Sequence, residues 1–322
     1  MMLSDRTQPV LYLAVPCYNE EAVLPVTAPE FIAKLQALHA AGRITADSRV
    51  LFVDDGSRDT TWDVISALAA EHSWVEGVRL TRNRGHQNAL LAGLMAAKDR
   101  CDCAVSMDAD LQDDVNVLDG FMEKFYQGCD VVYGVRSDRE TDTGFKRITA
   151  QGYYTFLEKL GVEIVYNHAD CRLMSRRALE ELSRYKETNL FLRGMVPHMG
   201  FKQDVVYFKR QERFAGESKY PLSKMLTLAW QGVTSFSVKP LKLITAFGIA
   251  ITLLSLFGLL TQGILALCGI GVGGLLPAVT SLWLLGGILL IALGLVGSYV
   301  GKLYEEVKAR PRFAFEKELF DK

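Results

Sequence analysis

Short apolar runs alternate with amphipathic stretches along the first part of the chain. Patterns of helical period separate these runs, with helices expected at about residues 28–41, around Trp62, from the turn at 81–87 through Ala97, and at 115–127. Strand and helix alternate with short connections, so the sequence predicts an α/β domain with a mostly parallel sheet and right-handed crossovers. The five expected strands lie at residues 10–15, 49–53, 75–80, 104–107 and 131–133.

Polar turns follow four of these strands. In a parallel sheet the carboxyl ends of the strands meet at one edge, where ligands of open α/β sheets bind. Each turn by itself could be ordinary helix capping, but four at one edge are better explained by a shared ligand. The turns contain Asn19 and Glu20, then Asp54 and Asp55, then Asn83 to His86, and finally Asp108 and Asp110.

The last of these turns carries the strongest chemical signal. Asp108 and Asp110 are separated by one residue, and such carboxylates repel each other unless a cation lies between them. Hard oxygen ligands favour Mg²⁺ or Mn²⁺, which can also hold a diphosphate. The plain alternative is a strand-to-helix turn in which Asp113 or Asp114 caps the next helix.

Other nucleotide motifs are missing from the sequence. No Gly-x-Gly-x-x-Gly follows the first strand and no Gly-x-x-x-x-Gly-Lys-Ser/Thr occurs, which argues against a dinucleotide dehydrogenase or a P-loop enzyme. The formal net charge of -1 gives no general attraction for nucleic acid. A nucleotide held by side-chain carboxylates and a metal fits better.

The uncharged stretch from Leu243 to Gly301 predicts a membrane anchor. It contains no Asp, Glu, Lys or Arg, and a membrane helix needs about 20 apolar residues. Residues 243–267 and 279–300 are therefore expected to form a hairpin of two transmembrane helices, with a buried core hairpin as the alternative. Lysines and arginines flank both ends, which places both ends in the cytoplasm. The N-terminus does not resemble a signal peptide, and the six cysteines lack paired Cys-x-x-Cys spacing, which favours a reduced compartment.

The expected organisation has four parts. Apolar residues recur at helical spacing before Pro240, which indicates a helix lying on the bilayer surface. The parts are a cytoplasmic catalytic domain (residues 1–221), an interfacial juxtamembrane helix (222–242), two transmembrane helices (243–301) and a cytoplasmic C-terminal tail (302–322).

Several motifs resemble those of a known family in their order along the chain. They are Pro16-Cys17-Tyr18-Asn19-Glu20-Glu21, the stretch from Val53 to Thr61, and Met107-Asp108-Ala109-Asp110-Leu111-Gln112. They resemble glycosyltransferase family 2, whose members have the GT-A nucleotide-sugar fold. Two later motifs, Asp170-Cys171-Arg172-Leu173-Met174-Ser175-Arg176 and the stretch from Arg213 to Tyr220, are similar to those of polyprenyl-phosphate glycosyltransferases such as dolichol-phosphate mannose synthase and bactoprenol glucosyltransferases. The resemblance spans nearly the whole chain, and Cys171 departs from the aromatic residue usual in the bacterial sequences.

The resemblance also implies roles for residues. Asp108 would bridge the ribose and a Mg²⁺ or Mn²⁺ ion, while Asp110 and Gln112 would hold the metal and the diphosphate. Asn83 and His86, at the third strand end, join the expected nucleotide-sugar site. The residues implied to contact the nucleoside are Pro16, Tyr18, Glu20 and Asp55.

Cations after the fifth strand suit a lipid phosphate, because arginine can pair with phosphate oxygens through two parallel hydrogen bonds. A solvated charged loop is the alternative. The expected acceptor residues are Arg136, Arg139, Lys146, Arg147, Arg213 and Lys219, and the expected catalytic residues are Asp170, Asp110, Arg136 and Arg139.

The role of Asp170 stays open on the sequence. A phosphate monoester has a second pKa of about 6 and is largely a dianion at neutral pH, so it needs no obligatory base. Asp170 could therefore align the acceptor or an arginine instead of removing a proton. A purely structural ion pair with Arg172 or Arg176 competes with both roles.

Together these observations predict an inverting hexosyltransferase in the cytoplasmic (inner) membrane. The expected reaction moves a hexose from a nucleotide diphosphate sugar, UDP-glucose favoured, to polyprenyl (undecaprenyl) phosphate for cell-envelope glycosylation. GDP-mannose, UDP-N-acetylhexosamine and a modified-pentose donor are alternatives. A processive polysaccharide synthase is disfavoured because no Gln-x-x-Arg-Trp occurs. A catalytically silent membrane scaffold or transport partner is the alternative of another class, and a homo-oligomer stays open.

Overall fold

The computed structural model describes residues 8–136, 168–186, 192–208, 268 and 275–320. Its centre is a mixed sheet with the strand order β7-β5-β6-β4-β1-β2-β3-β8. The strands are β1 (Leu11–Cys17), β2 (Arg49–Asp54), β3 (Val75–Leu80), β4 (Cys103–Ser106), β5 (Val131–Arg136), β6 (His168–Ser175), β7 (Gln203–Phe208) and β8 (Phe315–Leu319).

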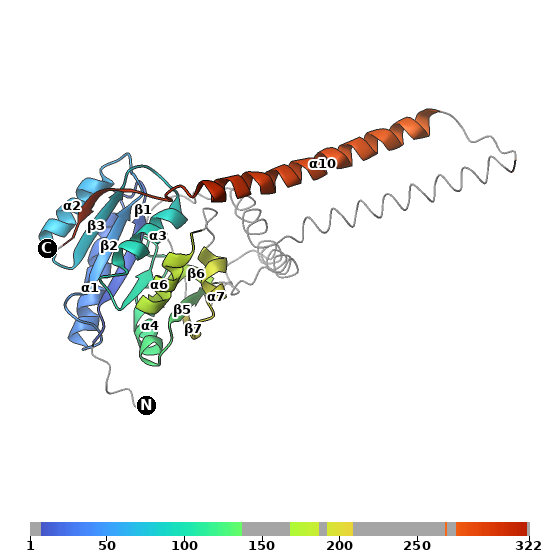
Figure 1. Cartoon of the computed structure of the whole chain (residues 1–322). Coiled ribbons are helices and arrows are strands. Elements are labelled where there is room, and N and C mark those ends of the chain that lie inside the picture. Colours follow the sequence, from blue (N-terminus) through green and yellow to red (C-terminus); the bar gives the residue numbers. More distant parts are fainter. Residues whose placement is uncertain (1–7, 137–167, 187–191, 209–267, 269–274, 321–322) are drawn as a thin grey trace.

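Helices cover both faces of the sheet (Figure 1). Side chains of a strand point alternately to its two faces, so Leu11 and Leu13 of β1 pack into one apolar cluster, while Tyr12 and Ala14 pack into the other. Both clusters are closed to water, which explains why the strands read as nearly continuous apolar runs. The first cluster includes α1 (Leu24–Ala40), α2 (Thr61–Glu71) and α4 (Val117–Tyr126), and the second includes α3 (His86–Ala97), α6 (Arg176–Arg184) and α7 (Leu192–His198).

The predicted row of strand ends is confirmed. Strands β4, β1, β2 and β3 are neighbours, and each pair among them is parallel. Their carboxyl ends therefore lie at one edge of the sheet. The four polar turns predicted from the sequence start from this edge.

Strand β6 interrupts the simple parallel pattern. It lies antiparallel between β4 and β5, with Ser106 opposite Arg172. Because β4 and β6 run in opposite directions, this register brings Asp170 beside the turn that follows β4. The sequence motif that begins at Asp170 therefore reaches the same edge from the opposite direction.

The observed start of helix α4 differs from the start that the capping alternative predicted for the acidic turn. It begins at Val117, and its N-cap is Asn116, whose side chain makes no capping hydrogen bond. Asp114 is not the assigned N-cap, but its Oδ1 accepts the Asn116 amide over 2.9 Å immediately before the helix, a hydrogen bond of the capping type. Capping therefore accounts for Asp114, whereas Asp108 and Asp110 lie farther from the helix start and need another explanation.

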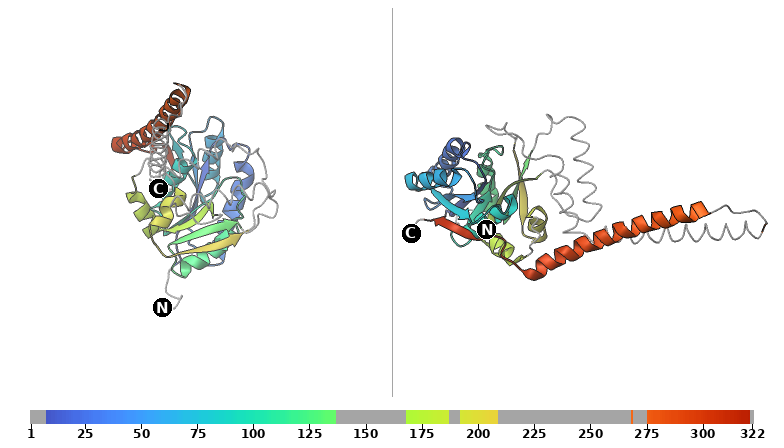
Figure 2. Two further views of the ribbon diagram at one scale, coloured as in Figure 1. Left: turned by 90° about the vertical axis from the view of Figure 1, so that its right-hand side faces the viewer. Right: turned by 90° about the horizontal axis from the view of Figure 1, so that it is seen from above.

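The C-terminal part leaves the sheet domain and returns to it. Helix α10 (Leu275–Lys308) extends away from the sheet, as the views of Figures 1 and 2 agree. After it the chain forms β8, which pairs antiparallel with β3. The segment predicted as a cytoplasmic C-terminal tail thus supplies the end of α10 and an edge strand.

The predicted interfacial helix at 222–242 and the first predicted span at 243–267 lie outside the described residues. Within the parts of the chain that the structure describes, no helix has the length and hydropathy required of a membrane span.

Candidate active site

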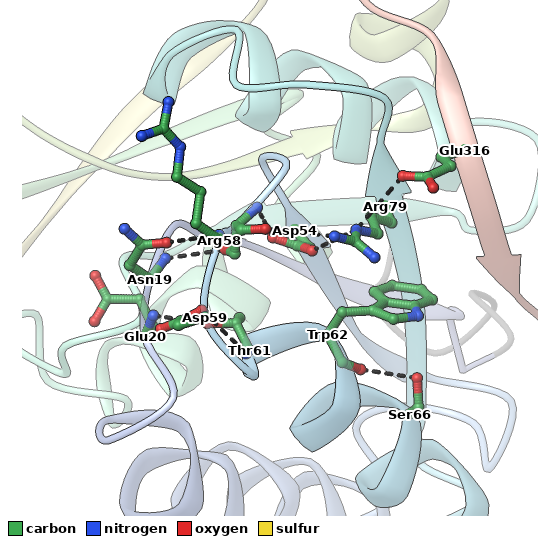
Figure 3. A network of polar contacts seen from close by, with 11 residues as sticks. Asn19, Glu20, Asp54, Arg58, Asp59, Thr61, Trp62, Ser66, Arg79 and Glu316 are labelled. Atoms are coloured by element: carbon green, nitrogen blue, oxygen red, sulfur yellow. Dashed lines mark hydrogen bonds and ion pairs between the residues drawn. The ribbon is translucent and has the colours of Figure 1, made fainter.

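The turns after β1 and β2 are joined by backbone-to-side-chain hydrogen bonds (Figure 3). The Asn19 amide donates to Ser57 Oγ over 3.0 Å, and the Arg58 amide donates to Asn19 Oδ1 over 3.0 Å. The Glu20 amide donates to Thr61 Oγ1 over 2.9 Å. Asn19 has φ 54, a left-handed conformation that Asn tolerates better than most residues. The two turns therefore form one unit that fixes the backbone around Tyr18 and Glu20.

Asp54 and Asp55 are both buried and bound within the protein. Asp54 Oδ1 accepts the Ser57 amide over 2.9 Å, and its Oδ2 lies 3.2 Å from Arg79 Nε. Burial raises the pKa of both carboxyls, and the hydrogen bonds they accept oppose this rise. Asp54 therefore holds its own turn together.

The carboxylate of Asp55 links its own turn to the turn after β3 through hydrogen bonds. Its two oxygens accept the amides of Arg84 and Gly85, over 2.7 and 2.9 Å, at the start of α3. Gly56, with φ +64, lies so close to this turn that an added Cβ would stand 2.6 Å from the carbonyl carbon of Arg82. The nucleoside contact predicted for Asp55 stays a prediction, and its observed contacts position α3.

The turn after β4 has a different character, because several carboxylates converge there. His86 Nε2, in the first turn of α3, lies 3.6 Å from Asp108 Oδ1 and 3.8 Å from Asp170 Oδ2. Asp110 Oδ1 accepts the Gln112 amide over 3.2 Å, across Leu111 with φ 51. The structure thus brings together residues that are far apart in the sequence.

The electrostatics of this turn show an excess of negative charge. Burial raises the pKa of Asp108 to about 6; His86 opposes the rise, and the carboxylates of Asp170, Asp113 and Asp110 add to it. Asp113 is 1% exposed and was considered in the sequence only as a helix cap. Its burial behind an Asp-x-Asp turn could not be read from residue types alone.

Asp170 is held by the buried arginine of its own strand. Arg172 is 2% exposed; its Nη2 lies 3.7 Å from Asp170 Oδ1, and its Nη1 donates to the Leu192 carbonyl over 3.2 Å. Arg176 pairs with Asp102 instead, at 3.4 Å. Of the two competing ion pairs considered for Asp170, the structure shows the one with Arg172. This contact leaves one carboxylate oxygen facing His86.

The donor set at this turn suits a hard divalent cation. Among the described residues, no three His, Cys, Asp or Glu side chains are placed to enclose a metal ion. Mg²⁺ in nucleotide sites is commonly bound by only one or two carboxylates together with substrate phosphates, so a protein cage is not required. Asp108, Asp110 and the buried Gln112 offer oxygen ligands, and a cation would offset the charge that raises the Asp108 pKa.

The remaining predicted residues divide into two groups. Pro16 is buried at the end of β1, Tyr18 is half-buried and Asn83 is exposed in the turn before α3. Arg136 is the last residue of β5 and pairs in register with Phe208. The other predicted acceptor residues lie outside the described residues, namely Arg139, Lys146, Arg147, Arg213 and Lys219.

Comparisons with known proteins find similar sequences and structures. The chain is 48% identical over 316 residues to the protein named "Uncharacterized glycosyltransferase YkoT" of Bacillus subtilis, covering 98% of this chain and 94% of that protein. It is 38% identical to the SfII prophage-derived bactoprenol glucosyl transferase of Shigella flexneri, covering 95% and 97%. Among solved structures, glucosyl-3-phosphoglycerate synthase from Mycobacterium tuberculosis aligns with 17% identity and a TM-score of 0.47, over 71% of this chain and 79% of that one. The family model "Glycosyl transferase family 2" matches residues 12–183, more than half of the chain, and together with relatives aligned along nearly its whole length it shows that the chain belongs to this family.

Proposed function

We propose that this glycosyltransferase moves glucose from UDP-glucose to a polyprenyl phosphate, with inversion at the anomeric carbon. The observation that carries the proposal is the convergence of Asp108, Asp170 and His86 at the edge where the strand ends meet. Relatives named bactoprenol glucosyl transferase align with 95% of the chain, which supports a lipid-linked acceptor.

Donor binding is assigned to the turns after β1 to β4. Asp108, Asp110 and Gln112 would hold Mg²⁺ or Mn²⁺, which would neutralise the diphosphate as it leaves. Tyr18 and Glu20 stand on the rigid unit formed by the first two turns, so they are suited to contact the nucleoside without rearrangement.

Sugar transfer needs an acceptor oxygen on the face of the sugar opposite the leaving diphosphate. The bond from the anomeric carbon to the diphosphate breaks while a bond to the lipid phosphate oxygen forms. Since that phosphate is largely ionised at neutral pH, no proton has to be removed. Asp170, fixed by Arg172 and facing His86, is therefore assigned to orient the reacting groups.

The acceptor side is assigned to the membrane surface. The cations predicted to grip the lipid phosphate are Arg136, Arg139, Lys146, Arg147, Arg213 and Lys219. The uncharged residues 243–301 would form the two-helix anchor, with the catalytic domain on the cytoplasmic face. Two described side chains of α10, Leu282 and Leu293, are 70% and 65% exposed, and a bilayer would cover such apolar surface.

The test uses the full-length protein in nanodiscs that contain undecaprenyl phosphate. Labelled UDP-glucose, GDP-mannose, UDP-N-acetylglucosamine and a UDP-pentose are supplied in turn, with Mg²⁺ or Mn²⁺. We expect a labelled lipid from UDP-glucose, formed only with a divalent cation and unaffected by Asp99→Asn, a change at an exposed aspartate beyond the end of α3.

If a donor other than UDP-glucose gives the labelled lipid, the proposed sugar is wrong but the proposed transfer to polyprenyl phosphate stands. A folded protein that neither transfers nor hydrolyses any of these donors would contradict the proposal and favour a silent scaffold.

A further inference from the structure

The segment that follows α10 is anchored to the sheet domain at several points. Arg312 Nη2 donates to the Tyr185 carbonyl over 2.6 Å, and the Thr81 amide donates to the Ala314 carbonyl over 3.0 Å. The guanidinium of Arg100 lies 3.9 Å from the centre of the Phe320 ring. Strand β8 is therefore a fixed part of the catalytic domain, although the sequence places it after the proposed membrane anchor.

One side chain of β8 reaches toward the turn after β2 through an arginine (Figure 3). Arg79 Nε lies 3.5 Å from Glu316 Oε2 and 3.2 Å from Asp54 Oδ2, and Arg79 Nη2 donates to the Ser57 carbonyl over 3.4 Å. In the β3–β8 register Arg79 pairs with Lys317 and Leu80 pairs with Phe315, so Glu316 is the extra residue at the irregularity between them.

Asp54 needs this arginine for a physical reason. It is fully buried, burial raises its pKa, and this rise is opposed first by the hydrogen bonds from Ser57 and then by the positive charge of Arg79. Asp54 in turn accepts the Ser57 amide, while Ser57 Oγ accepts the Asn19 amide. The position of Arg79 is thereby transmitted to both turns that flank the first two strand ends.

We propose that the C-terminal segment acts through Glu316 and Arg79 as a positioning element for the nucleotide-sugar site. Neither residue is placed to touch the reacting atoms; they fix the turn at residues 54–57, and through it the backbone at residues 18–21. The inference rests on the proposed function for the identity of the bound donor. It also gives a reason why the chain returns to the sheet after α10.

The test compares Glu316→Gln with Glu318→Gln, an exposed glutamate on the same strand. In full-length protein, UDP-glucose binding is measured by calorimetry with Mg²⁺, and hydrogen exchange is followed for peptides covering residues 18–21 and 54–61. We expect Glu316→Gln to weaken donor binding roughly two- to fivefold, as for a partly exposed ion pair, and to speed exchange in both turns. Glu318→Gln should change neither.

Changes at Arg79 sharpen the test. Arg79→Met should weaken donor binding by about tenfold, because a buried carboxylate loses its cation, and Arg79→Lys should restore part of it. In turnover assays the KM for the donor should rise while kcat stays near its wild-type value. A lowered thermal midpoint with unchanged KM and unchanged exchange in both turns would mean a merely structural role and would overturn the proposal.

Hydrogen exchange separates this inference from the proposed function. If the wild-type protein binds no UDP-glucose but Glu316→Gln still speeds exchange at residues 18–21 and 54–61, the donor assignment fails and the positioning link stands. If UDP-glucose binds and the Glu316 and Arg79 variants leave exchange and affinity unchanged, the positioning link fails and the donor assignment stands.

Discussion

Two acidic turns at the same edge of the sheet use their carboxylates in opposite ways. After β2, Asp54 and Asp55 accept hydrogen bonds from three backbone amides, and Asp54 also faces Arg79. After β4, Asp108 lies near three further carboxylates, with His86 as the neighbour that favours its ionised form. The first turn holds the protein together, whereas the second concentrates charge that a bound cation would balance. The residue types are alike in the two turns, but Asp54 and Asp55 are buried whereas the Asp108 side chain is 34% exposed, and the partners of the carboxylates differ. Exposure and partners together decide the role.

The largest expected effect is a loss of transfer activity on a change in the turn after β4. Asp108→Asn keeps the shape of the side chain but removes charge where the diphosphate would leave. We expect transfer to fall roughly 10²–10³-fold, in line with the loss of one preorganised electrostatic contact. Turnover of labelled donor measures the loss, and a thermal midpoint no lower than wild type shows that the fold is kept. Near-normal turnover in a protein inhibited by chelators would remove Asp108 from the metal site.

The second prediction concerns the turn after β2, where we expect a loss of stability. Asp55→Ala removes the acceptor of two partly buried hydrogen bonds, from the amides of Arg84 and Gly85, at a cost of about 2 to 4 kcal/mol of unfolding free energy. Denaturant unfolding of the full-length protein in detergent measures this loss. Asp99→Ala, at an aspartate 80% exposed, should change stability by less than about 0.5 kcal/mol. An Asp55→Ala protein as stable as wild type would show that the turn after β2 is not held by this carboxylate.

The sequence was sufficient for the part of the fold that depends on local pattern. Apolar runs bounded by polar turns predicted β1 to β5 closely, and short βα connections required parallel neighbours. This arrangement placed Asp108 and His86 at one edge without any knowledge of contacts. The role of β6 was harder to foresee, because antiparallel insertion between β4 and β5 depends on pairing across a long separation.

Two other features lay outside the reach of sequence patterns. Strand β8 has the sequence Phe-Glu-Lys-Glu-Leu, whose three central charged residues are exposed, and the sequence predicts it to lie in a cytoplasmic C-terminal tail. Its place in the sheet is set by pairing with β3. The difference between Asp55 and Asp108 was hidden for a similar reason, because it depends on which backbone amides the folded chain brings close.

A smaller expected effect tests whether the turn after β2 is rigid architecture. Gly56→Ala forces a side chain into the left-handed region and against the backbone at residues 82–83, so we expect a loss of about 1 to 2 kcal/mol or more. Gly200→Ala is the matched control, since Gly200 has φ +67 but no atom within 4 Å of an added Cβ. The difference between the two variants in denaturant unfolding isolates the contact between the turns. Equal losses would mean that the two turns do not press on each other.

The smallest expected effect is a pH dependence of folding stability at Asp108, which tests the difference between the two acidic turns. In the folded protein without a divalent cation the pKa of Asp108 is about 6, above its usual value of about 3.9 in an unfolded chain. The folded state therefore binds more protons than the unfolded state between these two values. This group's contribution to stability is fully present below about pH 4 and is lost as the pH rises through about 6.

Asp108→Asn should abolish this pH dependence. In chelator the thermal midpoint of the variant should exceed that of wild type at pH 7.5, and the gap should narrow at pH 5. Solvent will reduce the difference in thermal midpoint because the Asp108 side chain is 34% exposed. The prediction therefore concerns the sign of this difference and its change with pH, not its size. Added Mg²⁺ with UDP should stabilise wild type at pH 7.5 and leave the variant nearly unchanged, because binding to the folded state alone raises the midpoint. A gap that widens toward pH 5 would contradict the excess of negative charge at this turn, and with it the difference between the two acidic turns.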